Sequence, residues 1–271
     1  MAKGGKFPDL YLDTCPPAEK HDRILRRLQQ QDRRYVADVH RTLFPSDPQD
    51  TKTRTRKRVR TMGQLLSEIL GPLVERYSDR GRNVVSILDV GTGDQLLLHS
   101  YLDSLRGSAV RCIACDPFQT PSIHGNIAFV KKTLPEMATQ FKNSKADIAI
   151  ATTDMHHSAD PETYLETLAR TGKTLVVTEP IWDEVSPDDE RNTQIDKWRR
   201  RIGGLVECWR YTDEIGRGLP RATSHLSGSQ FGTLIAKVGL EIQGRPIIST
   251  PQSCCRETLM SVVLAMKGSV E

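Results

Sequence analysis

A regular alternation of short β-branched runs and helical patterns, from Asn83 to Pro180, is the feature that most constrains the fold. The apolar and β-branched runs predict five strands, at 83–90, 109–116, 126–132, 146–153 and 173–180. Residues with helical spacing lie between them and predict helices at 94–105, 134–141 and 160–171. After a predicted helix at 227–239, the runs 240–247 and 257–267 indicate a final antiparallel pair. The sequence therefore predicts an α/β fold with a doubly wound, mainly parallel, seven-stranded sheet that ends in an antiparallel pair.

Two regions fall outside this alternation. Residues 1–80 are predicted to form an N-terminal helical segment, with helices at 17–44 and 55–77. Residues 181–228 are rich in charge and contain all three tryptophans. We therefore expect two parts, 1–80 and 81–271, with residues 181–228 as an insertion in the second part.

The stretch SILDVGTGDQLLLH (86–99) joins a predicted strand to a predicted helix through Gly91 and Gly93. Ligands of an open parallel sheet bind beyond the carboxyl ends of the strands, where this turn is expected to lie. A dinucleotide-binding turn would have a third glycine where Leu96 stands, and Asp94 would set a carboxylate beside the pyrophosphate. The acidic turn favours a ligand with a positive end, such as S-adenosylmethionine (SAM), although Asp94 can also serve as a helix N-cap.

These motifs resemble those of class I, Rossmann-like, SAM-dependent methyltransferases over residues 84–180. ILDVGTGD is similar to the first family motif, with Asp89, Gly91 and Gly93 in place. Gln95 stands where that motif usually has its third glycine, a position that mainly serves close packing. IACDPF resembles the second motif, whose acid, here Asp116, pairs with the ribose hydroxyls. The segment 146–180 resembles the later motifs: a strand, a His-His pair, a helix and another strand.

The resemblance implies an enzyme that transfers a methyl group from SAM, and it implies roles for individual residues. The expected cofactor-binding residues are at or after the ends of predicted strands: Asp89, Gly91, Thr92, Gly93, Asp94, Asp116, Pro117, Leu134 and Thr153. The candidate catalytic residues follow or close the next strands: His156, His157, Asp154 and Glu179. In this family, regions such as 1–80 and 181–228 usually form the cap that selects the methyl acceptor.

Composition limits the location and the kind of site. The chain is 37% hydrophobic and 27% charged, which is typical of a globular protein, and no apolar run approaches the roughly 20 residues that span a membrane. The polar start MAKGGKFPDL lacks the apolar core of a secretory signal, so we expect a cytoplasmic protein with no membrane contact.

Cys112 and Cys115 are three apart on a predicted strand and face opposite sides, which favours buried thiols over a metal site.

The positive charge is concentrated in two stretches, within a net charge of +4. TKTRTRKRVR (51–60) has six basic residues, and KWRRR (197–201) forms a second cluster. Either stretch can be a solvated helix face, or it can contact the phosphates of RNA. The candidate contacts in the first stretch are Arg56, Lys57, Arg58 and Arg60.

Three functions remain open. The first, slightly preferred, is a methyltransferase that acts on an oxygen or nitrogen of a small molecule, which the His-His segment and the tryptophan-bearing insertion favour. The second is an RNA methyltransferase that acts on the cap guanine N7 or another base; a ribose 2′-O enzyme is disfavoured because Glu179, not a lysine, closes the fifth predicted strand. The third is a catalytically degenerate, partner-binding subunit, a reading that Gln95 supports.

Overall fold

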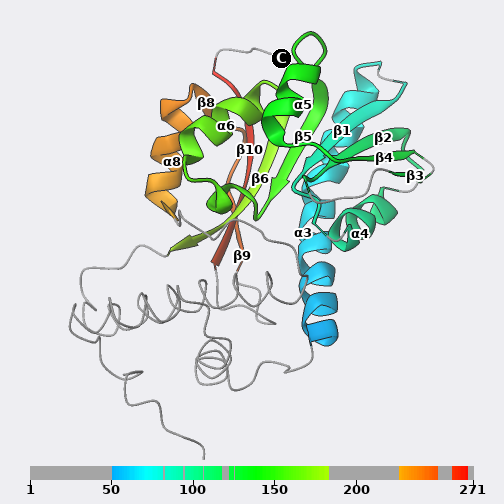
Figure 1. Ribbon diagram of the computed structural model, residues 1–271, viewed down its shortest axis with the longest axis horizontal. Helices are drawn as coiled ribbons and strands as arrows, with labels where there is room; N and C mark the ends of the chain where they lie inside the picture. The colour runs from blue at the N-terminus through cyan, green and yellow to red at the C-terminus, as the bar shows by residue number, and fades with distance from the viewer. Residues whose placement is uncertain are drawn as a thin grey trace, which may run out of the picture.

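The computed structural model describes residues 51–81, 83–93, 95–105, 107–117, 122–124, 126–182, 226–249 and 258–267. Its centre is a ten-stranded sheet with the order β3-β4-β2-β1-β5-β6-β10-β8; β7 pairs with β6, and β9 with β10 (Figure 1). The strand bounds are β1 Val85–Val90, β2 Val110–Cys115, β3 Ser122–His124, β4 Ile127–Val130, β5 Ala146–Thr152, β6 Gly172–Trp182, β7 Leu226–Ser227, β8 Leu240–Ile242, β9 Ile247–Ser249 and β10 Thr258–Met266.

The strand directions confirm the predicted fold class. β4, β2, β1, β5 and β6 run parallel, whereas β10 runs antiparallel to β6, β8 and β9. One strand differs from its prediction: the run 240–247 is divided into β8 and β9. Gly244 lies between them at φ +78°, a left-handed conformation that interrupts an extended strand. Three short strands, β3, β7 and β9, add to the seven expected.

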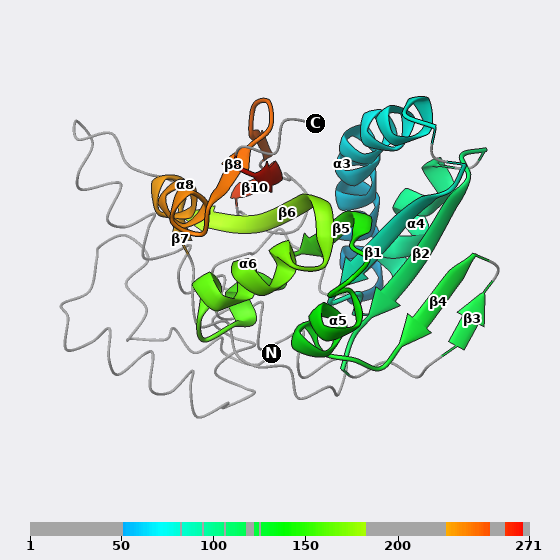
Figure 2. The ribbon, with the colours of Figure 1, turned by 90° about the horizontal axis from the view of Figure 1, so that it is seen from above.

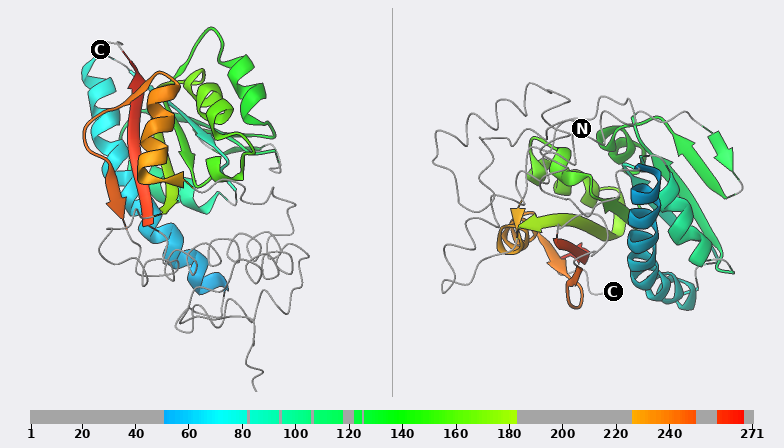
Figure 3. Two further views of the ribbon diagram at one scale, coloured as in Figure 1. Left: turned by 90° about the vertical axis from the view of Figure 1, so that its left-hand side faces the viewer. Right: turned by 90° about the horizontal axis from the view of Figure 1, so that it is seen from below.

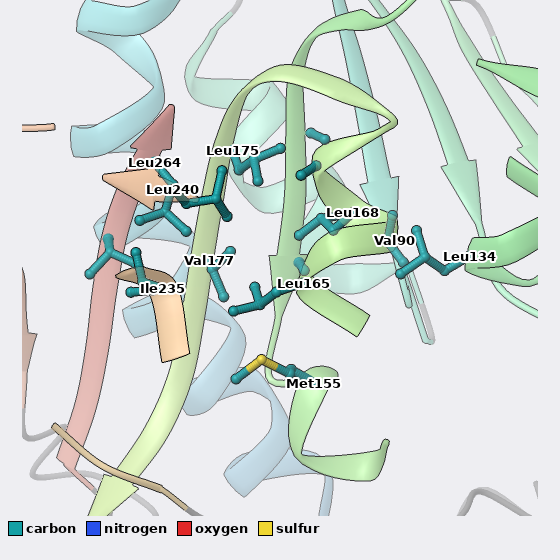
Figure 4. Packing of buried hydrophobic residues seen from close by; sticks show 14 of the residues in the cluster. Val90, Leu134, Met155, Leu165, Leu168, Leu175, Val177, Ile235, Leu240 and Leu264 are labelled. Carbon is teal, nitrogen blue, oxygen red and sulfur yellow. The ribbon is translucent and has the colours of Figure 1, made fainter. Parts of the chain in front are cut away.

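Helices cover both faces of the sheet (Figure 2). Their bounds are α3 Thr51–Asp79, α4 Leu96–Ser104, α5 Leu134–Gln140, α6 Pro161–Ala169 and α8 Gly228–Lys237, with a 3₁₀ turn, η1, at Met155–His157. One face packs against α3 and α4, and its buried residues form the α3-side core. The other face packs against α5, α6 and α8 and forms the α5-side core, part of which Figure 4 shows.

The period-two alternation of strand residues separates these two cores. On β5, Ile148 and Ile150 belong to the α3-side core, while Ala149 and Ala151 belong to the α5-side core. The same rule confirms the prediction for the two cysteines of β2, since Cys112 and Cys115 are buried thiols in opposite cores.

The helix predicted at 55–77 is α3, and its apolar face, with Leu66 and Leu70 fully buried, packs on α4 and the sheet. The other parts of the N-terminal segment and most of the insertion lie outside the described residues, so the proposed division into 1–80 and 81–271 stays a prediction. In the described segments, no helix combines the length and apolar character that crossing a membrane requires.

Gly172 begins β6, and we predict that Gly172→Ala destabilises the protein. An added Cβ would lie 2.6 Å from the Ala149 Cβ and 2.9 Å from the Ala149 backbone nitrogen, so the central strands β5 and β6 would have to move apart. Overpacking of this kind lowers the free energy of unfolding by about 1–3 kcal/mol, which urea denaturation measures. Gly232→Ala in α8 is the matched control, because nothing lies within 4 Å of its added Cβ. Equal stability of the two variants would contradict the described packing of β5 on β6.

Candidate active site

The glycine turn after β1 lies at the carboxyl edge of the sheet and is tied to the end of β2. The Gly91 N–H donates to the Cys115 carbonyl at 2.9 Å, and the Gly93 N–H donates to Asp116 Oδ2 at 3.0 Å. Gly91, Gly93 and Gln95 all have left-handed backbones, with φ of +71°, +56° and +69°. The position of the family's third glycine therefore requires a left-handed backbone here, in addition to close packing. Gln95 adopts this conformation at some energetic cost.

The carboxylate of Asp89 is buried beside this turn, on the face of the sheet that α4 covers. Tyr101 on α4 donates its hydroxyl to Asp89 Oδ2 at 2.8 Å. Burial raises the pKa of Asp89 to about 7; the Tyr101 hydrogen bond lowers it, and the like charges of Asp154 and Asp116 raise it further. Asp89 is thus a carboxylate that a nearby cation would help to ionise.

Gly91 also provides the space for the Asp154 carboxylate. An added Cβ on Gly91 would lie 2.5 Å from Asp154 Cγ and 2.6 Å from Oδ1. Tyr164, on α6, holds this carboxylate from the other side by donating its hydroxyl to Oδ2 at 2.6 Å. Burial is the main cause that raises the pKa of Asp154, and the neighbouring charge of Glu179 adds to it. The glycine of the first motif is therefore required for the packing of a second acid.

Glu179, on β6, organises the segment that follows β5. Its Oε1 accepts the backbone N–H groups of Asp154 at 2.9 Å and Met155 at 2.7 Å, and its Oε2 lies 2.7 Å from His156 Nδ1. Burial raises the pKa of Glu179 to about 7, against the effect of the two N–H donors. Thr153, immediately before these donors, has φ +52°, which is unfavourable for a β-branched residue. The Glu179 carboxylate therefore supports a strained turn.

The two histidines of the predicted pair have different surroundings. His156 is buried and bonded to Glu179, whereas His157 is half-buried. Their ring centroids are 4.2 Å apart at an interplanar angle of 38°. Both rings lie in η1, at the carboxyl end of β5, so the structure places an imidazole pair at the same edge as the glycine turn.

The polar groups predicted from sequence gather at this edge: Asp89, Gly91, Thr92, Gly93, Asp116, Thr153, Asp154, His156, His157 and Glu179. Pro117 follows Asp116 and is exposed. Leu134 is buried in the α5-side core, and Asp94 lies outside the described residues. Among the described residues, no group of His, Cys, Asp and Glu could hold a metal ion.

Tyr101 and Tyr164 were missed by the sequence analysis. Each is ten or more residues from its acid along the chain and on a different element, so no local spacing connects them. Only the rotation of α4 and α6 about their axes brings the hydroxyls to Asp89 and Asp154.

The basic stretch lies in the first turns of α3, which extend past the carboxyl edge of the sheet (Figures 1 and 3). Arg60 is exposed there. For Arg56, Lys57 and Arg58 only the helical backbone is described, so their contact with RNA stays a prediction.

Asp89 should make the stability of the protein depend on pH. Because its pKa is higher in the folded chain than its ordinary value of 3.8, its contribution to stability is complete at low pH and is lost as the pH rises to about 7. Asp89→Asn keeps an oxygen that can accept from Tyr101 but cannot ionise. The free energy of unfolding should therefore fall less between pH 5 and pH 8 in Asp89→Asn than in the wild type. If the free energies of unfolding of the two proteins changed in parallel with pH, the raised pKa of Asp89 would be contradicted.

The comparisons with known proteins identify the family. The sequence matches a family model described as a methyltransferase domain over residues 29–243, which is most of the chain. No curated protein gives a significant match.

Among solved structures, the DszA carbon methyltransferase has a TM-score of 0.57 at 17% identity, with 93% of this chain and 71% of that chain covered. Two proteins from Burkholderia thailandensis are less similar. The 1,6-didemethyltoxoflavin-N1-methyltransferase has a TM-score of 0.49 at 12% identity, with 93% and 91% covered. An O-methyltransferase family protein has 0.45 at 15%, with 82% and 62% covered, so this chain spans less than two thirds of its length.

The family match and the sheet agree with the resemblance seen in the sequence. The first motif forms the turn after β1, the second ends β2, and the His-His pair follows β5. The resemblance to SAM-dependent methyltransferases is confirmed, and with it the cofactor, S-adenosylmethionine. The chain belongs to the methyltransferase domain family and is a class I, Rossmann-like, SAM-dependent enzyme.

Proposed function

We propose that the enzyme transfers a methyl group from SAM to an oxygen or nitrogen of a small molecule, at the carboxyl ends of β1, β5 and β6. The observation that carries the proposal is the Glu179–His156 pair, which lies 2.7 Å apart beside the glycine turn. A carboxylate that orients an imidazole is the arrangement of a general base.

The residues at the turn fit a cofactor with a positive end. Asp89 and Asp154 are acids whose charged neighbours include further acids, so a sulfonium and an ammonium would lower the cost of their ionisation. We assign Asp89, Gly91, Thr92, Gly93, Asp94 and Thr153 to the amino-acid and sulfonium side of the cofactor, and Asp116 and Pro117 to the ribose side. We assign Leu134, which is buried in the α5-side core, to the cofactor as an apolar contact.

When bound, SAM supplies the electrophilic methyl group. The chain must hold the acceptor in line with that group and exclude water. Correct positioning by itself accelerates the transfer considerably. For a hydroxyl acceptor, His156 or His157 would also remove a proton. Glu179 would orient the His156 ring and stabilise its positive charge. Asp154 would present a second carboxylate to the reacting groups from the side of the glycine turn.

The acceptor class can be tested with tritiated SAM. Purified enzyme is incubated with total RNA in one reaction and with a low-molecular-weight metabolite extract in another. We expect label in the small-molecule fraction. Label in RNA that disappears when Arg56, Lys57, Arg58 and Arg60 are neutralised would support the RNA alternative instead. SAM binding without transfer to either fraction would support the degenerate, partner-binding alternative.

We predict that His156→Gln lowers the single-turnover rate at least about a hundredfold and changes the dissociation constant for SAM little, because general-base catalysis contributes about 10²–10⁴. His157→Gln is the matched variant from the same turn, and the larger loss identifies the base. Calorimetric titration with SAM, with NAD as a control ligand, separates binding from chemistry. An unchanged rate in both variants would remove the general base from the proposal.

A further inference from the structure

Among the residues that the structure describes, Thr152 has a buried side-chain hydroxyl with no hydrogen-bond partner. Thr152 is the last residue of β5, it is 9% exposed, and Thr153 and Asp154 follow it. A buried hydroxyl without a partner destabilises a fold, so such groups are rare and call for an explanation. The position of this hydroxyl suggests that its partner is a ligand.

The neighbouring strands do not satisfy the hydroxyl. Thr152 is paired in register with Thr178 on β6, but the Thr178 hydroxyl is bonded to Ser261 Oγ on β10 at 2.8 Å. Residues 148 and 150 of β5 face the α3-side core, so by alternation Thr152 faces the same side. Asp89 faces that side too, since Ile87 belongs to the same core and Tyr101 of α4 bonds to the Asp89 carboxylate.

The hydroxyl and the Asp89 carboxylate therefore share one face of the sheet at its carboxyl edge. Asp89 is paired in register with Ile150, and Thr152 is two residues farther along β5, about 7 Å closer to the edge. The Asp154 carboxylate lies at the same edge, against Gly91. A group placed beyond the turn would meet two acids and one hydroxyl.

The strand order indicates which end of the cofactor lies here. The proposed ribose contact, Asp116, follows β2, and β2 and β5 lie on opposite sides of β1. A cofactor whose ribose lies at β2 and which crosses the glycine turn brings its opposite end to β5. That end of SAM carries an ammonium and a carboxylate, which a hydroxyl can serve as acceptor and donor.

We propose that the Thr152 hydroxyl is a cofactor contact that binds the amino-acid end of SAM, together with Asp89 and Asp154. This inference rests on the proposed arrangement of the cofactor across the turn, and it adds a residue that the sequence motifs do not include. The hydroxyl is left unpaired in the free enzyme and gains its partner when the cofactor binds.

Thr152→Val tests the inference, because valine keeps the shape and removes only the hydroxyl. Without an unpaired hydroxyl, the free variant should melt at the same temperature as the wild type or higher. Its dissociation constants for SAM and S-adenosylhomocysteine should rise roughly tenfold to a hundredfold, the effect of losing a hydrogen bond to a charged group. Affinity for 5′-deoxy-5′-methylthioadenosine, which lacks the amino-acid end, should not change.

Thr174→Val is the matched control on β6. The Thr174 hydroxyl is buried but bonded to the Tyr77 hydroxyl at 2.8 Å, so this variant should melt at a lower temperature and bind all three ligands as the wild type does.

Three results would overturn the inference. Unchanged SAM affinity in Thr152→Val would show that the hydroxyl binds water and not the cofactor. An equal loss of affinity for all three ligands would place the contact elsewhere on the cofactor. A wild-type protein that binds none of the three would overturn the proposed cofactor site and this inference together.

Discussion

The site depends on one buried carboxylate, that of Glu179. It accepts two consecutive backbone N–H groups, from Asp154 and Met155, and it contacts the imidazole of His156. These contacts hold the chain in a tight turn directly after the left-handed Thr153, a conformation that would otherwise be unfavourable. The same turn directs the Asp154 carboxylate to the glycine turn of β1. Glu179 thereby connects the glycine turn to the imidazole pair.

The second constraint is charge. Asp89 and Glu179 are buried acids and Asp154 is half-buried, and desolvation raises the pKa of all three, so the free enzyme keeps them at a cost to its stability. Tyr101 and Tyr164 reduce that cost, because each donates a hydroxyl to one acid. A cation bound at the edge would reduce it further. The acids at the glycine turn therefore favour a cationic cofactor, and they would repel a pyrophosphate.

Much of this arrangement was predictable, because it depends on where strands end. The alternation of strands and helices predicted the sheet. The acids and glycines at or after the ends of strand runs, including Asp89, Asp116 and Glu179, predicted the carboxyl edge. The contacts that complete the site were not predictable. Tyr101 and Tyr164 depend on how helices rotate, the fit of Asp154 against Gly91 depends on tertiary packing, and the unpaired Thr152 hydroxyl is visible only once its neighbours are placed. Likewise, one glycine, Gly244, divides a run that reads as one strand.

In the proposed arrangement, SAM crosses the glycine turn from the end of β2 to the end of β5. A crystal structure of the enzyme with S-adenosylhomocysteine would test this arrangement, because one electron-density map gives the positions of both the ribose and the amino-acid end. We expect the ribose hydroxyls within hydrogen-bond distance of Asp116 and the amino-acid end between Asp89, Thr152 and Asp154. A cofactor bound in the reverse direction, or away from the carboxyl edge of β1 and β5, would contradict it.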